Sequence, residues 1–170
     1  MRVPFAGGIT EDITPDMDMY FSYSVDTNDD GKILCFTATF DNHNNVFIVK
    51  ENKDGTHTTK RIYFSNYSLS EPICSSDGAF VCVSETNSKT KLSTLLLLST
   101  KNNLIAVRSR SFIEITPLVF STTRPQTVLA LARMGDWRRP VFYDFMHNRI
   151  TEVKHPTLRG DTWVLQWDEA

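Results

Sequence analysis

The segment Asp29-Asp-Gly-Lys-Ile-Leu-Cys-Phe36, a turn followed by a short apolar run, recurs 47 residues later as Ser76-Asp-Gly-Ala-Phe-Val-Cys-Val83. A third copy follows after a further 48 residues as Arg124-Pro-Gln-Thr-Val-Leu-Ala-Leu131. The Asp-Gly pairs of the first two copies favour tight turns, because glycine adopts positive φ angles without steric cost. The third copy has no glycine, so we expect a turn of different construction there. Recurrence at this interval indicates a repeat protein.

Each copy belongs to a unit of four predicted strands. First strands are predicted at residues 19–24, 72–74 and 115–120, third strands at 45–49, 93–98 and 140–145, and fourth strands at 60–64, 104–107 and 149–153. β-branched and aromatic residues fill these runs, and no segment has a sustained helical period. The sequence therefore predicts one all-β domain over residues 1–170. We expect three four-stranded antiparallel propeller-type blades at about 19–66, 69–110 and 113–155.

The first unit resembles a known repeat. Residues 22–36, followed by 45–49 and by the turn Asn52-Lys-Asp-Gly55, are similar to the repeat of TolB-like and WD-like β-propellers. In the TolB-like repeat a Ser-Pro-Asp-Gly-Lys turn precedes a small apolar strand, and a second Asp-Gly turn follows. The resemblance covers about residues 19–155. This chain departs from it in lacking the proline, and the third unit lacks Asp-Gly. The resemblance implies a propeller and leaves function open.

The number of units is too small for a closed propeller. Three units and one trailing strand, predicted at residues 162–167, fall short of the roughly four to eight blades that usually close a ring. A row of three sheets would leave two apolar faces exposed. Two chains forming a six-bladed ring would solve this, as would a longer propeller of which the chain is a fragment, or a compact sandwich. We expect the homodimeric six-bladed ring.

Composition excludes several classes of partner. Hydrophobic residues make up 41% of the chain, charged residues 22%, and the net charge is −2, so neither nucleic acid nor a membrane is an expected partner. Residues 1–59 hold four basic and ten acidic side chains, whereas 60–139 hold eleven basic and five acidic. A basic face that meets an acidic partner would explain this difference, and so would solvated charges spread over the blade edges, which is the interpretation that we favour. Cys35, Cys74 and Cys82 form no CxxC motif. We expect buried free thiols and, without a leader-like apolar stretch, a cytoplasmic protein.

No motif for catalysis or for a cofactor is present. Asp26, Asn28 and Asp30 match the opening of a calcium loop, but Leu34 and Thr37 occupy positions where that loop requires oxygen ligands. We therefore expect a tight turn and no metal. There is no GxSxG elbow and no glycine-rich phosphate loop, so we expect a protein that is not an enzyme and holds no cofactor.

Arg133, Asp136, Trp137, Arg138 and Arg139 are the candidate partner-binding residues, in a predicted loop between the second and third strands of the third unit. Arginines beside tryptophan are typical of interface hot spots and could also stack a sugar. In the alternative, Trp137 packs on its own blade and the arginines are solvated. The predicted function is a non-catalytic scaffold that binds another protein, as a recruiter, inhibitor or neutralising binder. A glycan-binding oligomeric lectin and an accessory propeller fragment of a peptidase-like protein are the alternatives.

Overall fold

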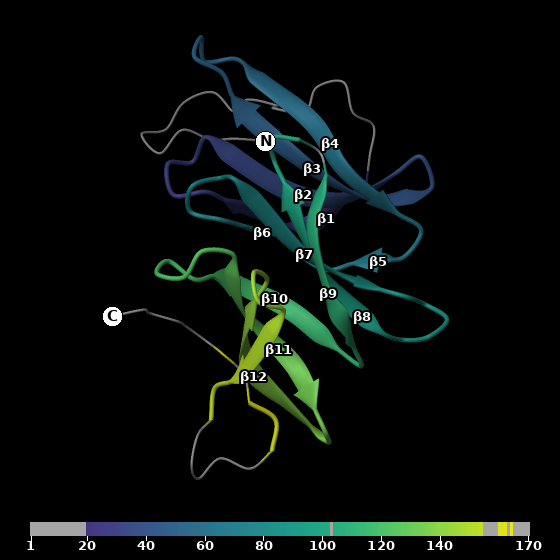
Figure 1. The fold of residues 1–170 in the computed structure, drawn as a ribbon. Coiled ribbons are helices and arrows are strands. Elements are labelled where there is room, and N and C mark those ends of the chain that lie inside the picture. Colours follow the sequence, from purple (N-terminus) through teal and green to yellow (C-terminus); the bar gives the residue numbers. More distant parts are fainter. Residues whose placement is uncertain (1–19, 103, 155–159, 163, 165–170) are drawn as a thin grey trace.

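The structure is a computed structural model that describes residues 20–102, 104–154, 160–162 and 164. Thirteen β-strands and no helix occur among these residues. They form three antiparallel sheets that follow one another in a row, from the first sheet at the top of Figure 1 to the third at the bottom. The predicted all-β class and the three blade-like sheets are confirmed. The described part of the chain contains no helix long and apolar enough to cross a membrane.

Every predicted strand of the three units is present, and most are longer than predicted. Blade 1 consists of β1 Tyr20–Thr27, β2 Ile33–Phe40, β3 His43–Glu51 and β4 His57–Ser65. Blade 2 consists of β5 Ser68–Leu69, β6 Ile73–Cys74, β7 Phe80–Thr86, β8 Ser93–Ser99 and β9 Ile105–Phe112. Blade 3 consists of β10 Ile115–Phe120, β11 Thr127–Met134, β12 Trp137–Asp144 and β13 Arg149–Glu152.

The first strand of blade 2 is divided into two short pieces. Both β5 and β6 pair with β7, and Pro72 lies between them. Proline has no N–H to donate to a neighbouring strand, which explains an interruption at this point. Blade 2 therefore has five strands in four strand positions.

The turns that precede β2 and β7 are built by the same hydrogen bonds from different side chains. Asn28 and Ser75 each accept, at 2.9 Å, the N–H of the residue five positions later. Asp30 and Asp77 accept the N–H two positions later, at 3.0 and 2.9 Å. These backbone bonds are the main reason that the pKa of both carboxyl groups lies below its usual value. The turn predicted in place of a calcium loop is confirmed.

The turn before β11 has no glycine and differs in construction from the other two turns. It is closed by the bond from Ser121 N–H to the Thr127 carbonyl at 2.9 Å, and is one residue longer than the other two turns. Gln126 adopts a φ of 51°, close to the 69° of Gly31 and the 66° of Gly78. As a result β2, β7 and β11 begin at Ile33, Phe80 and Thr127, at constant intervals of 47 residues.

Side chains point alternately to the two faces of a strand, and in blade 2 both faces are apolar. Blade 2 therefore packs against a neighbour on each side. Even-numbered leucines of β8 face blade 1, and odd-numbered leucines face blade 3. The cluster between blades 1 and 2 contains Cys35, Val46, Ile48, Ile62, Cys74, Val81, Val83, Leu96 and Leu98. The cluster between blades 2 and 3 includes Cys82, Leu95, Leu97, Val128, Ala130, Ala132, Val141 and Tyr143.

The outer faces of blades 1 and 3 are buried in part, although Val25 beside Phe36 and Val119 beside Leu129 are 57% and 38% exposed. Phe36 and Phe47 lie on the side of blade 1 away from blade 2, in a separate cluster, and each is 1% exposed. Leu129, on the corresponding side of blade 3, is also 1% exposed. The prediction that a row of three leaves both faces open is therefore wrong for these residues. The six-bladed homodimer stays a prediction.

Most of the predicted trailing strand, residues 162–167, lies outside the described residues. Thr162 and Val164 are described, and neither lies in a strand. The N–H of Thr162 donates to the carbonyl of Arg138 at 3.1 Å, so this residue contacts β12.

All three cysteines are buried free thiols, as predicted. Burial raises the pKa of Cys82. The pKa of Cys35 is raised mainly by a hydrogen bond with Cys74 and further by burial.

The packing of Gly78 against blade 1 leads to a test of the contact between blades. A Cβ on Gly78 would lie 2.6 Å from Ile33 Cδ1 and 3.2 Å from Asn28 Nδ2, whereas a Cβ on Gly31 would meet no atom within 4 Å. Both glycines have a positive φ, which costs alanine about 1 kcal/mol. We expect Gly31→Ala to lower the free energy of unfolding by about 1 kcal/mol and Gly78→Ala by about 2 kcal/mol. Urea denaturation measures both, and equal losses would contradict the contact.

Candidate binding groove between the first two blades

The two ends of the blades carry different connections. The turns that precede β2, β7 and β11 lie at one end, together with the turns that follow β3, β8 and β12 (Figure 1). The hairpins that join β2 to β3, β7 to β8 and β11 to β12 lie at the other. We name the first the Asp-Gly end. At this end the turns of blades 1 and 2 contact each other through a hydrogen bond from Asp29 N–H to the Ser76 carbonyl at 3.2 Å.

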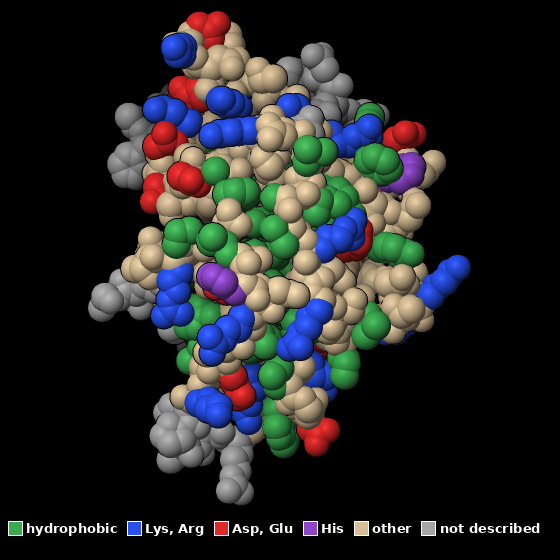
Figure 2. Space-filling model, in the orientation of Figure 1, with side chains coloured by type: hydrophobic (Ala, Val, Ile, Leu, Met, Phe, Trp, Pro, Cys, Tyr) green, Lys and Arg blue, Asp and Glu red, His purple; other side chains and the backbone are tan. Residues whose placement is uncertain are grey.

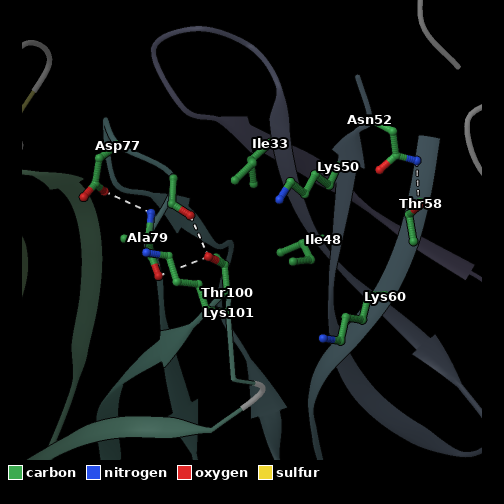
Figure 3. A pocket seen from close by; sticks show the side chains of 11 residues that line it. Ile33, Ile48, Lys50, Asn52, Thr58, Lys60, Asp77, Ala79, Thr100 and Lys101 are labelled. Atoms are coloured by element: carbon green, nitrogen blue, oxygen red, sulfur yellow. Dashed lines mark hydrogen bonds between the residues drawn. The ribbon is translucent and has the colours of Figure 1, made fainter. Parts of the chain in front are cut away.

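A groove of about 570 Å³ lies at the Asp-Gly end between blades 1 and 2 (Figure 3). Strand register determines its blade 1 wall. Ile33 pairs with Lys50, Lys50 pairs with Thr58, and Ile48 pairs with Lys60. Paired residues share a face of a sheet, so these five side chains are all on the side of blade 1 that faces blade 2.

The opposite wall comes from two turns of blade 2. Asp77, Gly78 and Ala79 belong to the turn before β7, and Thr100 and Lys101 follow β8. The hydroxyl of Thr100 donates to the carbonyl of Gly78 at 2.7 Å and links the two turns. Gly78 and Ile33 both line the groove and approach each other closely, since a Cβ on Gly78 would lie 2.6 Å from Ile33 Cδ1.

Asp77 is the only carboxylate among the described residues that line the groove, and its oxygen is already engaged. Oδ1 accepts hydrogen bonds from the N–H of Ala79 at 2.9 Å and from the hydroxyl of Ser75 at 2.7 Å. These two bonds, with a smaller effect of Lys101, hold the pKa of Asp77 below its usual value. The group is therefore ionised at neutral pH and acts as a structural acceptor.

Three lysines, Lys50, Lys60 and Lys101, line the groove and are exposed. None of them forms an ion pair with another described residue. With one ionised aspartate the groove carries an excess of positive charge. Lys and Arg side chains (blue) are spread from the first blade to the third on the face in Figure 2, so basic charge is not confined to blade 3.

A second, smaller hollow of about 320 Å³ lies at the same end between blades 2 and 3. Serine and threonine residues of the two turns are five of its eleven lining residues. Arg124, also in its lining, lies with its guanidinium 4.9 Å from the centre of the Phe142 ring. Asp77 lines both hollows, so they are neighbours along the Asp-Gly end.

The residues predicted to bind a partner lie at the opposite end, in the β11–β12 hairpin of blade 3. The prediction that they lie in a loop is wrong for four of the five. Arg133 belongs to β11, and Trp137, Arg138 and Arg139 belong to β12. Of the five, only Asp136 is in the turn, which it forms with Gly135. A φ of 65° at Gly135 allows so short a connection, because two-residue hairpins need a positive φ at the first position.

The structure brings together only part of this predicted cluster. Arg133 and Arg138 are cross-strand partners, and both pair with Glu114, at 3.5 and 2.8 Å. Arg139 is adjacent to Arg138 in the strand and therefore on the other face, where it lies 3.9 Å from Glu152. Asp136 accepts a hydrogen bond from Arg133 at its backbone carbonyl.

Trp137 is 47% exposed, so it does not fold back completely on its own blade. The three arginines are not simply solvated, because Arg133 and Arg138 form ion pairs with Glu114, and Arg139 forms one with Glu152. Partner binding by this cluster stays a prediction.

The groove lysines were not among the sequence-predicted site residues. A signal was present in the hairpin around the Asn52-Lys-Asp-Gly55 turn, where Ile48-Val-Lys50 and Thr58-Thr-Lys60 alternate on either side. Alternation places Lys50 and Lys60 on one face once the register is known. The residues of the blade 2 wall could not be predicted from such a pattern.

Metal binding finds no support among the described residues, which contain no group of three or more His, Cys, Asp or Glu side chains able to hold an ion. Two of the calcium-like residues bond to each other, from Asn28 Nδ2 to Asp30 Oδ1 at 2.8 Å. The third, Asp26, accepts the N–H of Cys74 in blade 2 at 2.7 Å.

No family model and no curated protein matches the sequence. Solved structures do. The β-propeller domain of the Trilobed protease from Pyrococcus furiosus is 17% identical with a TM-score of 0.56, over 82% of this chain and 43% of that one. An uncharacterized protein of Listeria monocytogenes is 10% identical with a TM-score of 0.62, over 80% of this chain and 40% of that one. TolB from Acinetobacter baumannii is 13% identical with a TM-score of 0.60, over 78% of this chain and 32% of that one.

The chain thus spans less than half the length of each of these structures. At such low identity the likeness is one of fold. It agrees with the three four-stranded units and their constant spacing, and we conclude that the chain has a TolB-like, propeller-type fold.

Proposed function

We propose that this protein is a non-catalytic binding module that holds a partner protein at the Asp-Gly end of its blades. The observation that carries the proposal is the groove between blades 1 and 2. Its volume of about 570 Å³ is within the usual range of ligand sites, and its lysines have no ion-pair partner among the described residues. Loops presented by a rigid scaffold are the usual place for binding residues.

The chemistry of the groove suits binding better than catalysis. Its polar groups are ammonium, hydroxyl and amide groups, and its carboxylate is held by two hydrogen bonds of its own turn. Recruitment, inhibition and neutralisation all agree with such a module. Cytoplasmic location and homo-oligomerisation stay predictions, as do the lectin and the peptidase-accessory alternatives.

Site-specific photo-crosslinking tests the proposal. Benzoylphenylalanine in place of Asn52, an exposed residue lining the groove, should crosslink one reproducible partner in native extract. The same group in place of Lys89, an exposed residue at the opposite end, should not. The captured protein, once purified, should bind the unmodified chain in calorimetry. Absence of any product above the Lys89 background would refute a partner at this end.

A further inference from the structure

We infer that the groove between blades 1 and 2 binds an acidic peptide segment that carries an apolar side chain among its carboxylates. The inference rests on the proposed function and names the class of partner. It concerns the groove residues Lys50, Lys60, Lys101, Ile33 and Ile48.

The ligand must be an anion, because the charge of the groove is not balanced internally. None of the acidic side chains in the described ion pairs lines the groove: Asp30 pairs with Lys32, Glu85 with Arg108, Glu114 with Arg133 and Arg138, Asp144 with His147, and Glu152 with Arg139. The lysines of the groove have no such partner in the described part of the chain. Ammonium groups left exposed at the walls of one groove attract anions from solution.

The spacing of the two walls favours an extended ligand with several carboxylates. Lys50 and Lys60 project from blade 1, whereas Lys101 lies on blade 2, on the side of Asp77 and Ala79 (Figure 3). Several carboxylates of one peptide can meet ammonium groups at separate points of a hollow of about 570 Å³, whereas a small anion offers a single point of charge.

The floor favours a peptide over an inorganic anion. Ile33 is half-buried and lies in the groove beside Ile48, which is only 4% exposed, so the apolar surface of the floor comes mainly from Ile33 (Figure 3). An apolar side chain of the ligand gains free energy when it covers such a surface. The side-chain amide of Asn52 donates a hydrogen bond to the hydroxyl of Thr58 at 2.9 Å on the rim of the groove. These two side chains therefore shape the rim more than they offer free hydrogen-bond donors to a ligand.

Two other classes of anionic or polar ligand fit less well. None of the described residues lining the groove is aromatic, and none is an arginine. Single-stranded nucleic acids and glycans are commonly bound by stacking on aromatic rings, which this lining does not provide. Lysine acts as a point charge, which serves carboxylates of variable spacing.

Amide chemical shifts of the whole chain provide the test. We expect the peptide acetyl-Glu-Glu-Leu-Glu-Glu-amide to shift the amides of Gly78, Ala79 and Thr100 and to leave those of Lys89 and Gly135 unchanged. The matched peptide with Gln in place of Glu should bind at least tenfold more weakly. Added salt should weaken the Glu peptide, because the groove is open to solvent.

Charge reversal completes the experiment. Lys50→Glu/Lys60→Glu should weaken the Glu peptide at least tenfold, whereas Lys89→Glu/Lys154→Glu, with the same change of net charge, should stay within twofold. If the reversed variant fails to fold, Lys50→Gln/Lys60→Gln replaces it with the same direction expected. Equal binding of the Glu and Gln peptides, or tighter binding of an RNA hexamer or inorganic phosphate, overturns the inference. Crosslinking from position 52 then decides separately whether the binding module stands.

Discussion

Leu97→Ala is expected to lower the free energy of unfolding by about 2–5 kcal/mol. The side chain is fully buried in the middle of β8 and faces blade 3, within the cluster that contains Cys82 and Ala130. Truncation to alanine removes apolar contacts on both blades and leaves a cavity that close-packed sheets fill only in part. Urea denaturation followed by circular dichroism measures the loss.

Leu96→Ala should lower the free energy of unfolding by a similar amount, through lost contacts with blade 1 in place of blade 3. Leu96 is equally buried but faces blade 1, within the cluster of Cys35 and Ile48. Leu104→Ala provides the control, because this leucine is 63% exposed and its loss should change stability by less than about 0.5 kcal/mol. If either buried leucine behaved like Leu104, the corresponding pair of blades would not be packed as described.

The same alternation explains why the fold could be predicted from the sequence. The strands of blade 2 carry apolar residues at both odd and even positions, as in Leu95–Leu98, and a sheet with two apolar faces needs a neighbour on each side. The Asp-Gly turns are local as well, since Asp30 and Asp77 bond to N–H groups only two residues away. Features that depend on residues close together in the sequence can therefore be predicted from the sequence.

The errors concern features determined by tertiary contacts. From the sequence, Arg133 and Trp137 are predicted to lie in a loop, where charged residues interrupt the apolar pattern. In the structure the arginines stay in the strands because Glu114, a residue of the preceding turn, pairs with two of them. Burial of Phe36 and Phe47 on the outer face of blade 1 could not be predicted either, because a pattern of alternation does not say what covers a face.

The groove illustrates both cases. The register of the β3–β4 hairpin, which follows from its turn, places Lys50 and Lys60 on one face. The other wall depends on how closely blade 2 approaches, and that distance is determined where Gly78 meets Ile33. The shape of the groove thus depends on Gly78 and Ile33, which lie far apart in the chain, whereas two of its charges, Lys50 and Lys60, come from a single hairpin.

The second large effect is expected from Glu85→Ala, which should lower the free energy of unfolding by about 2–4 kcal/mol. Glu85 lies in β7, and its side chain is 11% exposed. Oε1 accepts hydrogen bonds from the hydroxyls of Tyr63 and Ser65, at 2.5 and 2.6 Å, both in β4 of blade 1. Oε2 pairs with Arg108 of β9 at 3.3 Å. Removal of the carboxylate leaves two hydroxyl donors between the blades without their acceptor.

Tyrosine titration distinguishes this role from simple loss of packing. Burial, and then the hydrogen bond to Glu85, raise the pKa of Tyr63 above its ordinary value. A raised pKa means that the protonated hydroxyl stabilises the fold below the unfolded pKa and that this contribution disappears as pH rises through the folded pKa. In Glu85→Ala the absorbance titration should therefore shift one tyrosine towards lower pH.

Glu71→Ala is the matched control, because this exposed glutamate forms no ion pair with another described residue, and its loss should cost less than about 0.5 kcal/mol. A small loss for Glu85→Ala, with an unchanged tyrosine titration, would mean that the Glu85 carboxylate contributes little to holding blades 1 and 2 together. A large loss with a shifted titration would mean that the polar contact specifies how the two blades align. That alignment is the one on which the groove depends, because Lys50 and Lys60 belong to one blade and Lys101 to the other.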